Sequence, residues 1–153
     1  MYTDINLEEI EEVNAAFPSH LIVVLYDEAI ASLMASIQAI GDGDIEARFN
    51  ATSHTAEVIS QLYLALDMET GGEIAENLGA IYNHIITQLP RINFANDQQV
   101  AEQAIKLLRP IRDSWFELDE RIRSTVENAE AEDMADVAAA LVAKEAMAAQ
   151  PTL

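Results

Sequence analysis

Residues 66–85 read LDMETGGEIAENLGAIYNHI and combine a glycine pair with the apolar spacing of a helix. Adjacent glycines mark either a phosphate-binding loop or a tight turn. A phosphate loop needs a lysine and a hydroxyl residue after its glycines, whereas a glutamate and apolar residues follow here. We therefore expect Gly71 and Gly72 to form a tight turn between two helices. Glu73 is then expected in the first turn of the second helix, where a carboxylate favours the positive end of the helix dipole.

The sequence on both sides of this turn carries helical stripes. Apolar residues recur at steps of three and four in four segments, 22–40, 45–66, 74–89 and 100–122. Short connections between long helices favour antiparallel neighbours. We therefore predict an all-α fold, an antiparallel up-down-up-down four-helix bundle. Gly41 is expected to end the first helix in a left-handed conformation, Asp44 to cap the second, and Pro110 to kink the fourth without ending it.

Two segments lie outside the four stripes. Residues 4–14 place Ile5, Leu7, Ile10 and Val13 among five acids and predict a short amphipathic helix in an N-terminal arm. Residues 128–153 are rich in alanine, with Met134, Val137, Leu141 and Met147 along one side of an additional C-terminal helix. The predicted domains are therefore an N-terminal arm at 1–16, a bundle at 17–127 and a tail helix at 128–153.

The bulk composition excludes several functions. The 153 residues carry a formal charge of −19, which repels phosphate backbones and argues against nucleic-acid binding. Cysteine is absent, so disulfides, thiol nucleophiles and cysteine-based zinc sites are excluded. Uninterrupted apolar runs such as residues 21–26 are too short to span a membrane, and the chain opens with the acidic MYTDINLEEIEE rather than a basic leader. We expect a soluble cytoplasmic protein without membrane insertion.

The chain lacks the patterns of catalytic and metal sites. A di-iron bundle needs Glu-x-x-His motifs, but Phe17, Ala51 and Ile81 stand three positions before the histidines. His54 has neither the lysine nor the glycine of a phosphotransfer site nearby, and GDGD at 41–44 lacks the remaining ligands of a calcium loop. We predict no catalytic, cofactor-binding or metal site, and thus no enzyme.

The helices carry more apolar residues than one inward stripe requires. Val23, Val24 and Tyr26 flank the first stripe, and residues 62–64 spread around the second helix. A helix that is apolar over more than one face is either covered by its own chain or binds a partner. Both interpretations stay open here, and the partner would be an amphipathic helix lying in an apolar groove.

The quoted segment closely resembles the central motif of the flagellin-specific export chaperones, the FliS family. That motif reads Leu-Asp-x-x-x-Gly-Gly-x-[Ile/Leu]-Ala-x-Asn-Leu-x-x-[Leu/Ile]-Tyr. FPSHLIVVLYDEAI at 17–30 is similar to the first-helix motif of the family, and IRDSWFEL at 111–118 to its fourth-helix motif. The resemblance covers roughly residues 13–120, with three motifs in order. The chain departs from the family at its N-terminal arm, which has Glu8 or its neighbours where a tyrosine is common, at Pro110 and in its alanine-rich tail.

The resemblance implies a cytoplasmic four-helix bundle that binds the C-terminal segment of newly made flagellin. Such a chaperone prevents premature polymerisation, keeps flagellin competent for flagellar type III secretion and delivers it to the flagellar export gate. It uses no nucleotide, metal or other cofactor. We expect a monomer, with a weak dimer as the alternative. Two other functions stay open: an assembly or regulatory adaptor of the same fold that no longer binds flagellin, and a self-associating structural protein.

The resemblance also assigns candidate roles to residues. Asp67, Gly71 and Gly72 are expected to shape the turn, and Asn77 to bond either across the bundle or to the main chain of the client. Lys106, Arg109 and Arg112 either meet client carboxylates or pair with acids of this chain. The candidate client-binding groove consists of Ile22, Tyr26, Ile30, Leu62, Ile74, Leu78, Ile81, Tyr82 and Ile86, several of which could instead be core residues. The candidate gate, which would cover the empty groove, consists of Ile5, Leu7, Ile10 and Val13 in the arm and Leu141 in the tail.

Overall fold

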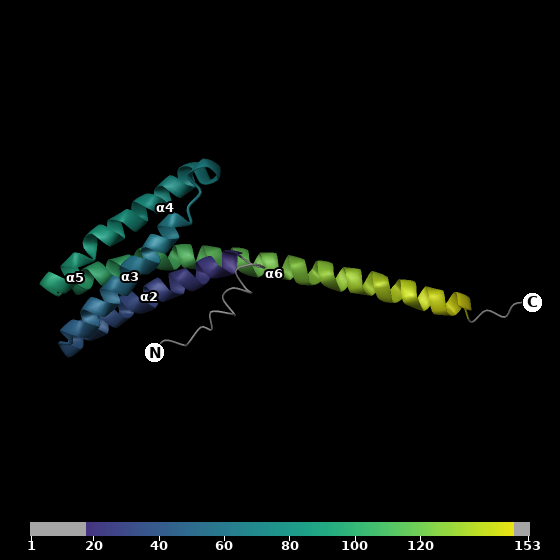
Figure 1. The fold of residues 1–153 in the computed structure, drawn as a ribbon, viewed down its shortest axis with the longest axis horizontal. Coiled ribbons are helices and arrows are strands. Elements are labelled where there is room, and N and C mark those ends of the chain that lie inside the picture. The colour runs from purple at the N-terminus through teal and green to yellow at the C-terminus, as the bar shows by residue number, and fades with distance from the viewer. Residues whose placement is uncertain (1–17, 149–153) are drawn as a thin grey trace, which may run out of the picture. The chain divides into compact units, whose positions relative to one another are not determined.

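The computed structural model describes residues 18–148, with side chains through residue 144, and every element in this part is a helix (Figure 1). Four helices are long: α2 (Pro18–Asp42), α3 (Ile45–Leu64), α4 (Met68–Gln88) and α6 (Gln98–Ala148). A short helix, α5 (Pro90–Ala95), precedes α6. The all-α class is confirmed, while the up-down-up-down order stays a prediction.

The chain divides into two compact units between Phe116 and Glu117. We call residues up to Phe116 the core unit and residues from Glu117 the tail unit. Helix α6 begins in the core unit and ends in the tail unit, without a helix end at the predicted limit of residue 127. The domain limits 1–16, 17–127 and 128–153 stay a prediction.

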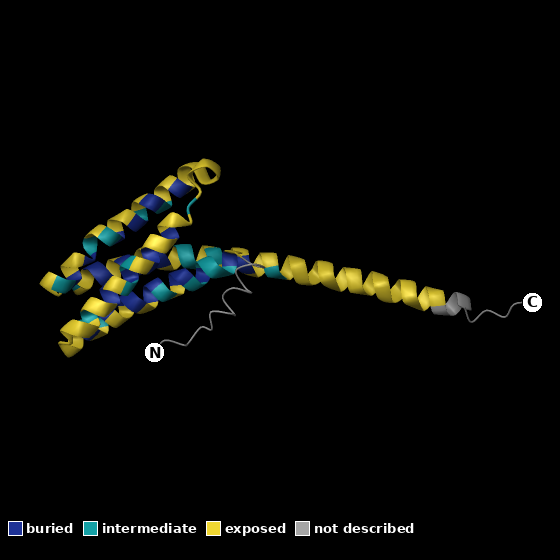
Figure 2. Cartoon of the chain, viewed as in Figure 1, coloured by how far each residue is buried: buried dark blue, intermediate teal, exposed yellow. Residues whose placement is uncertain are grey.

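The hydrophobic core joins α2, α3, α4, α5 and the start of α6 (Figure 2). Helix α3 packs most extensively on α2. Leu33 of α2, Ile59 of α3 and Leu108 of α6 are completely buried. Full burial of one such side chain contributes roughly 1.5–3 kcal/mol to folding. Among the helices in the described range, only α2 is long and apolar enough to cross a membrane, and the core helix of a soluble protein passes the same test.

The connection between α2 and α3 depends on one glycine and one aspartate. Asp44 precedes α3, and its carboxylate accepts a hydrogen bond from the backbone N–H of Ala47 at 3.0 Å, as predicted for an N-cap. The left-handed residue is Gly43, with φ of 66°, and not Gly41, which lies inside α2. The prediction for Gly41 was wrong because both glycines fit the end of the apolar stripe, and only Gly43 follows the last helical residue.

The glycine pair lies at a kink that divides α4 into two helical pieces. Asp67 caps the N-terminus of α4, so the connection from α3 consists of residues 65–67 and the first turn of α4 contains Glu69. Gly72 then interrupts α4 with φ of 51° and ψ of −128°, values that favour glycine. The expectation of a tight turn between two helical pieces at the pair is therefore confirmed, and Glu73 begins the longer piece. The piece before the turn is a single turn capped by Asp67, and not the long helix α3 as the sequence had suggested. The pair separates one short helical turn from the longer part of α4.

Two prolines have different effects on the chain. Pro90 is the first residue of α5, a position where its missing N–H costs nothing. Helix α5 was not predicted, because six residues carry too little periodicity. Pro110 lies inside α6, which continues beyond it as expected, and the hydroxyl of Ser114 donates to the Pro110 carbonyl at 3.1 Å.

Candidate client-binding pocket

A cavity of about 340 Å³ lies in the core unit between α2, α3, α4 and the part of α6 that carries Trp115. We call it the apolar pocket. The connection 65–67 and the first turn of α4 form one of its sides. Its apolar walls include Ile22, Leu62, Ile74, Leu78, Tyr82 and Trp115. A hollow of this size and composition binds apolar groups and offers few polar partners.

Five of the nine predicted groove residues line the apolar pocket. They range from Ile74, which is 72% exposed, to Tyr82, which is 2% exposed. The five are Ile22, Leu62, Ile74, Leu78 and Tyr82. Trp115 also lines the pocket but is not among the predicted groove residues. Its place in the fourth apolar stripe and in the fourth-helix motif was a usable signal.

The other four predicted groove residues lie elsewhere in the core unit. Tyr26 and Ile30 belong to the buried core. Ile81 and Ile86 are partly buried and pack against it. None of these four lines the apolar pocket in the described part of the chain. Their assignment to a client-binding surface stays a prediction.

Tyr82 is held in place by a second tyrosine. The hydroxyl groups of Tyr82 on α4 and Tyr26 on α2 form a buried hydrogen bond with each other. The ring centroids are 6.3 Å apart and the rings are tilted by 53°. Burial raises the pKa of both phenols, so each stays protonated. The pair fixes the ring that faces the apolar pocket and provides a buried polar link between α2 and α4.

Asp67 is the charged residue that lines the apolar pocket, and its carboxylate is hydrogen-bonded to the first turn of α4. The carboxylate accepts hydrogen bonds from the backbone N–H groups of Glu69 and Thr70 at 3.1 and 3.0 Å, and from the Thr70 hydroxyl at 2.7 Å. The bond from the Thr70 N–H is the main cause that lowers the pKa of Asp67. Asp67 thus stabilises the first turn of α4, while Asn77, the other predicted polar residue, is exposed.

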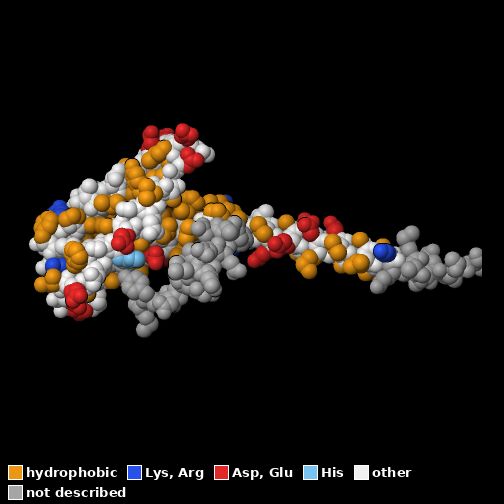
Figure 3. Space-filling view, in the orientation of Figure 1, with side chains coloured by type: hydrophobic (Ala, Val, Ile, Leu, Met, Phe, Trp, Pro, Cys, Tyr) orange, Lys and Arg blue, Asp and Glu red, His pale blue; other side chains and the backbone are white. Residues whose placement is uncertain are grey.

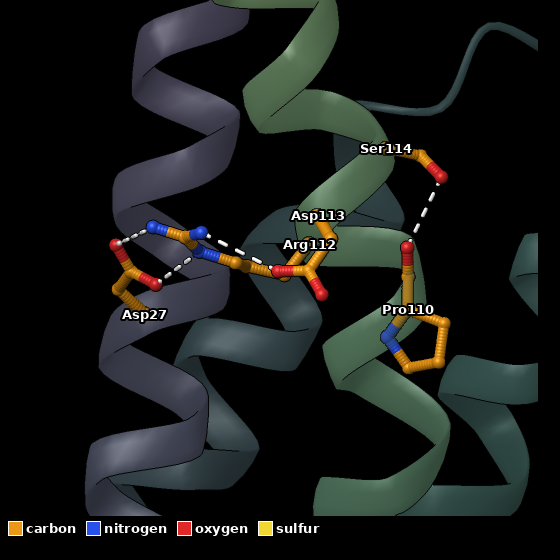
Figure 4. Close-up of polar contacts among 5 residues, drawn as sticks. All are labelled: Asp27, Pro110, Arg112, Asp113 and Ser114. Carbon is orange, nitrogen blue, oxygen red and sulfur yellow. Dashed lines mark hydrogen bonds and ion pairs between the residues drawn. The ribbon is translucent and has the colours of Figure 1, made fainter.

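Arg112 pairs with an acid of its own chain (Figure 4). Its Nε donates to Asp27 Oδ1 at 2.8 Å and its Nη2 to Asp27 Oδ2 at 3.4 Å. The bond to Asp27 is the main cause that raises the pKa of Arg112. The guanidinium also lies 4.7 Å from the ring centre of Phe116. Of the two predicted roles for this base, the structure shows the intramolecular one, whereas Lys106 and Arg109 are exposed and form no ion pair within residues 18–144.

A second apolar hollow of about 410 Å³ lies at α3, α4 and α5. Ile86, Leu89 and Phe94 are among its lining residues. Ile45 and Phe49, at the start of α3, do not line this hollow and are 68% and 59% exposed. Both belong to the second apolar stripe, which predicts buried side chains. That prediction is wrong for these two residues, because the first turns of α3 are not packed against the core. The described part of the chain contains no cluster of His, Asp and Glu side chains that could hold a metal ion.

Of the five candidate gate residues, only Leu141 lies within the described part of the chain. Ile5, Leu7, Ile10 and Val13 lie outside the described residues. Leu141 lies in the tail unit and is 59% exposed. A gate function for these five residues stays a prediction.

The sequence of this chain is similar to a family of known proteins. The family model described as flagellar protein FliS matches residues 2–122. The flagellar secretion chaperone FliS of Salmonella typhimurium is 34% identical over 118 residues, which span 76% of this chain and 86% of that protein. Its namesake in Vibrio cholerae is 29% identical over 107 residues, spanning 70% and 79%. The flagellar secretion chaperone FliSB of Pseudomonas aeruginosa is 28% identical over 114 residues, spanning 74% and 89%.

The family match contains every residue named above for the apolar pocket, from Ile22 to Trp115. It also contains the capping Asp67 and the glycine pair. FliS proteins are chaperones and form a non-enzymatic family. This chain belongs to the FliS family of flagellar secretion chaperones.

Proposed function

We propose that this protein is a cytoplasmic export chaperone that binds the C-terminal segment of flagellin in the apolar pocket. It thereby prevents premature polymerisation and keeps flagellin competent for flagellar type III secretion. The observation that carries the proposal is an apolar cavity with an exposed rim inside the part of the chain that matches the FliS family. The chaperone acts without a cofactor and as a monomer.

The walls of the apolar pocket suit the apolar face of an amphipathic segment. Ile74 stands exposed at the rim and Tyr82 is buried below, so a client side chain that enters gains contacts at both levels. A client that becomes ordered on binding loses conformational entropy, and burial of apolar area must offset this loss. Lys106 and Arg109 are available to carboxylates of the client because both are exposed and form no ion pair within residues 18–144. Arg112, in contrast, already pairs with Asp27.

The N-terminal arm is the proposed gate of the pocket. Ile22, a wall residue, lies about one helical turn after Pro18, where α2 begins. Residues 1–16 precede this point and carry the apolar residues Ile5, Leu7, Ile10 and Val13. We propose that the arm covers the empty pocket and yields to flagellin, and that the loaded chaperone then delivers its client to the export gate.

Titration calorimetry with a peptide of the flagellin C-terminal segment from the same organism tests the proposal. We expect one-to-one sub-micromolar binding with a negative heat-capacity change, the signature of apolar burial. Ile74→Asn should weaken the affinity by about tenfold or more, since it places an amide at the rim of a contact surface. Ile45→Asn is the matched control, because Ile45 is similarly exposed but does not line the apolar pocket.

Two outcomes would contradict the proposal. Equal affinities of the Ile74 and Ile45 variants would show that flagellin binds outside the apolar pocket. Absence of binding to the intact chain and to variants lacking the arm would favour an adaptor that shares the fold but has lost flagellin.

A further inference from the structure

The tail unit carries an exposed apolar row on α6 beyond the family match, which ends at residue 122. Met134, Val137 and Leu141 are 74%, 60% and 59% exposed, and Val126 is 37% exposed. Their spacings of eight, three and four residues keep them within about a quarter of the helix circumference. An isolated helix gains most of its stability from packing of such a row, so the row is suited to a partner.

Carboxylates interrupt this apolar row. Glu130 lies four residues after Val126, and Asp133 lies four residues before Val137, so both acids share the face of the row. Acidic and apolar groups therefore alternate along the tail (Figure 3). The stretch from Arg123 to Lys144 contains five acids and no base between these two residues. None of the five acids forms a hydrogen bond or ion pair within residues 18–144.

The two carboxylates decide which occupant fits the row. Burial of a carboxylate without a partner is costly, so a purely apolar surface is a poor occupant. The apolar pocket contains no base among its lining residues. A second copy of the tail brings the same five acids and only one exposed base, Lys144, that is not ion-paired within residues 18–144, because its Arg121 and Arg123 already pair with Glu117 and Asp119. An occupant that supplies lysine or arginine satisfies both carboxylates and the apolar residues.

We propose that the face formed by Val126, Glu130, Asp133, Met134, Val137 and Leu141 is a docking surface for a basic amphipathic helix of another protein. We call it the tail face. The apolar residues of the partner pack against Val137 and Leu141, and its lysines or arginines lie opposite Glu130 and Asp133. Ion pairs at helical spacing and apolar packing then act together. This inference does not rest on flagellin binding, because it uses residues outside the family match.

A labelled synthetic peptide with leucines and lysines at helical spacing is the probe, titrated into the full-length protein. Two tail variants separate the contributions: Val137→Ala with Leu141→Ala removes the apolar contacts, and Glu130→Gln with Asp133→Gln removes the charges. Alanine and glutamine preserve the helix because both are good helix formers. Glu69→Gln with Glu73→Gln is the matched control, since it removes the same charge from the core unit.

Each tail variant should weaken binding of the peptide by about tenfold or more, and the control by less than about twofold. The same peptide with glutamates in place of its lysines should not bind. An equal loss of peptide affinity in the Glu130/Asp133 variant and in the Glu69/Glu73 control would overturn the proposal, because it would show that the peptide responds only to the net charge of the protein. Conversion of a dimer to a monomer by the alanine variant would identify a second copy as the occupant. Tighter flagellin binding by that variant would instead support Leu141 as a gate residue of the apolar pocket.

Discussion

The hydroxyl of Tyr26 on α2 bonds to the hydroxyl of Tyr82 on α4 inside the core unit, 56 positions apart in sequence. Both side chains are almost completely buried. Neither phenol has another hydrogen-bond partner in the described part of the chain. Within the described residues, each hydroxyl therefore depends on the other for its hydrogen bond.

This dependence predicts strong coupling between the two tyrosines. Tyr26→Phe should lower the free energy of unfolding by about 1–3 kcal/mol, because it leaves the Tyr82 hydroxyl buried without a partner. The double variant should cost less than the sum of the single variants by about 1 kcal/mol or more, since it leaves no orphan. Urea unfolding of the four proteins measures the coupling. Additive losses would show that water already satisfies each hydroxyl.

The same pair predicts a loss of stability in alkali. Burial raises the pKa of Tyr26 above its unfolded value of about 10, so the folded state retains the proton that the unfolded state releases. The stabilisation is fully present below that pH and declines as the pH rises above it. Unfolding free energies measured across this range should fall in the parent protein. In Tyr26→Phe/Tyr82→Phe the fall should be smaller, and an identical fall would contradict the prediction.

Two glycines should respond to alanine in opposite directions. Gly72→Ala should destabilise the protein by about 1–2 kcal/mol, because φ of 51° is strained for any residue with a Cβ. Gly41→Ala should stabilise it by up to about 1 kcal/mol, because Gly41 lies in α2 and a Cβ there meets no atom within 4 Å. Thermal unfolding of both variants provides the comparison. A stabilised Gly72 variant would mean that α4 is continuous in solution.

The ion pair between Arg112 and Asp27 predicts a small, salt-dependent contribution. Arg112→Met should cost up to about 1 kcal/mol at low salt and less at high salt, because both side chains are partly exposed to water. Arg109→Met, one turn earlier on α6, should change the stability by less than about 0.5 kcal/mol. Chemical unfolding at two salt concentrations distinguishes the variants. A loss at Arg112 that does not respond to salt would assign it to packing on Phe116 rather than to charge.

The sequence predicts the helices better than their ends. The apolar stripes locate all four long helices, because a period of three to four residues continued over five turns has no alternative explanation. Asp44 is identified as a cap by its position before a stripe. Gly41 and Gly43 are indistinguishable to the same reasoning, since both follow the first stripe. The glycine pair predicts the break at Gly72, but the short turn before it, residues 68–71, is not predicted because Asp67 is not recognised as its cap.

The site is less predictable than the fold. Periodicity places Tyr26 and Tyr82 among apolar residues, but it does not tell which one is exposed to the pocket, because that depends on how α2 and α4 are rotated. Ile74 was found through the family motif. The tail face has no counterpart in that motif. The sequence predicts its apolar side at Met134, Val137 and Leu141, whereas its extension back to Val126 follows from the unbroken course of α6.

The walls of the apolar pocket come from distant parts of the chain, with Ile22 near its beginning and Trp115 on the last helix. Ribosomes synthesise a protein from its N-terminus, so α2, α3 and α4 are made before Trp115. A nascent chain that ends before Trp115 therefore lacks one wall of the apolar pocket. If the apolar pocket binds flagellin as proposed, a chain that ends before Trp115 should not bind it.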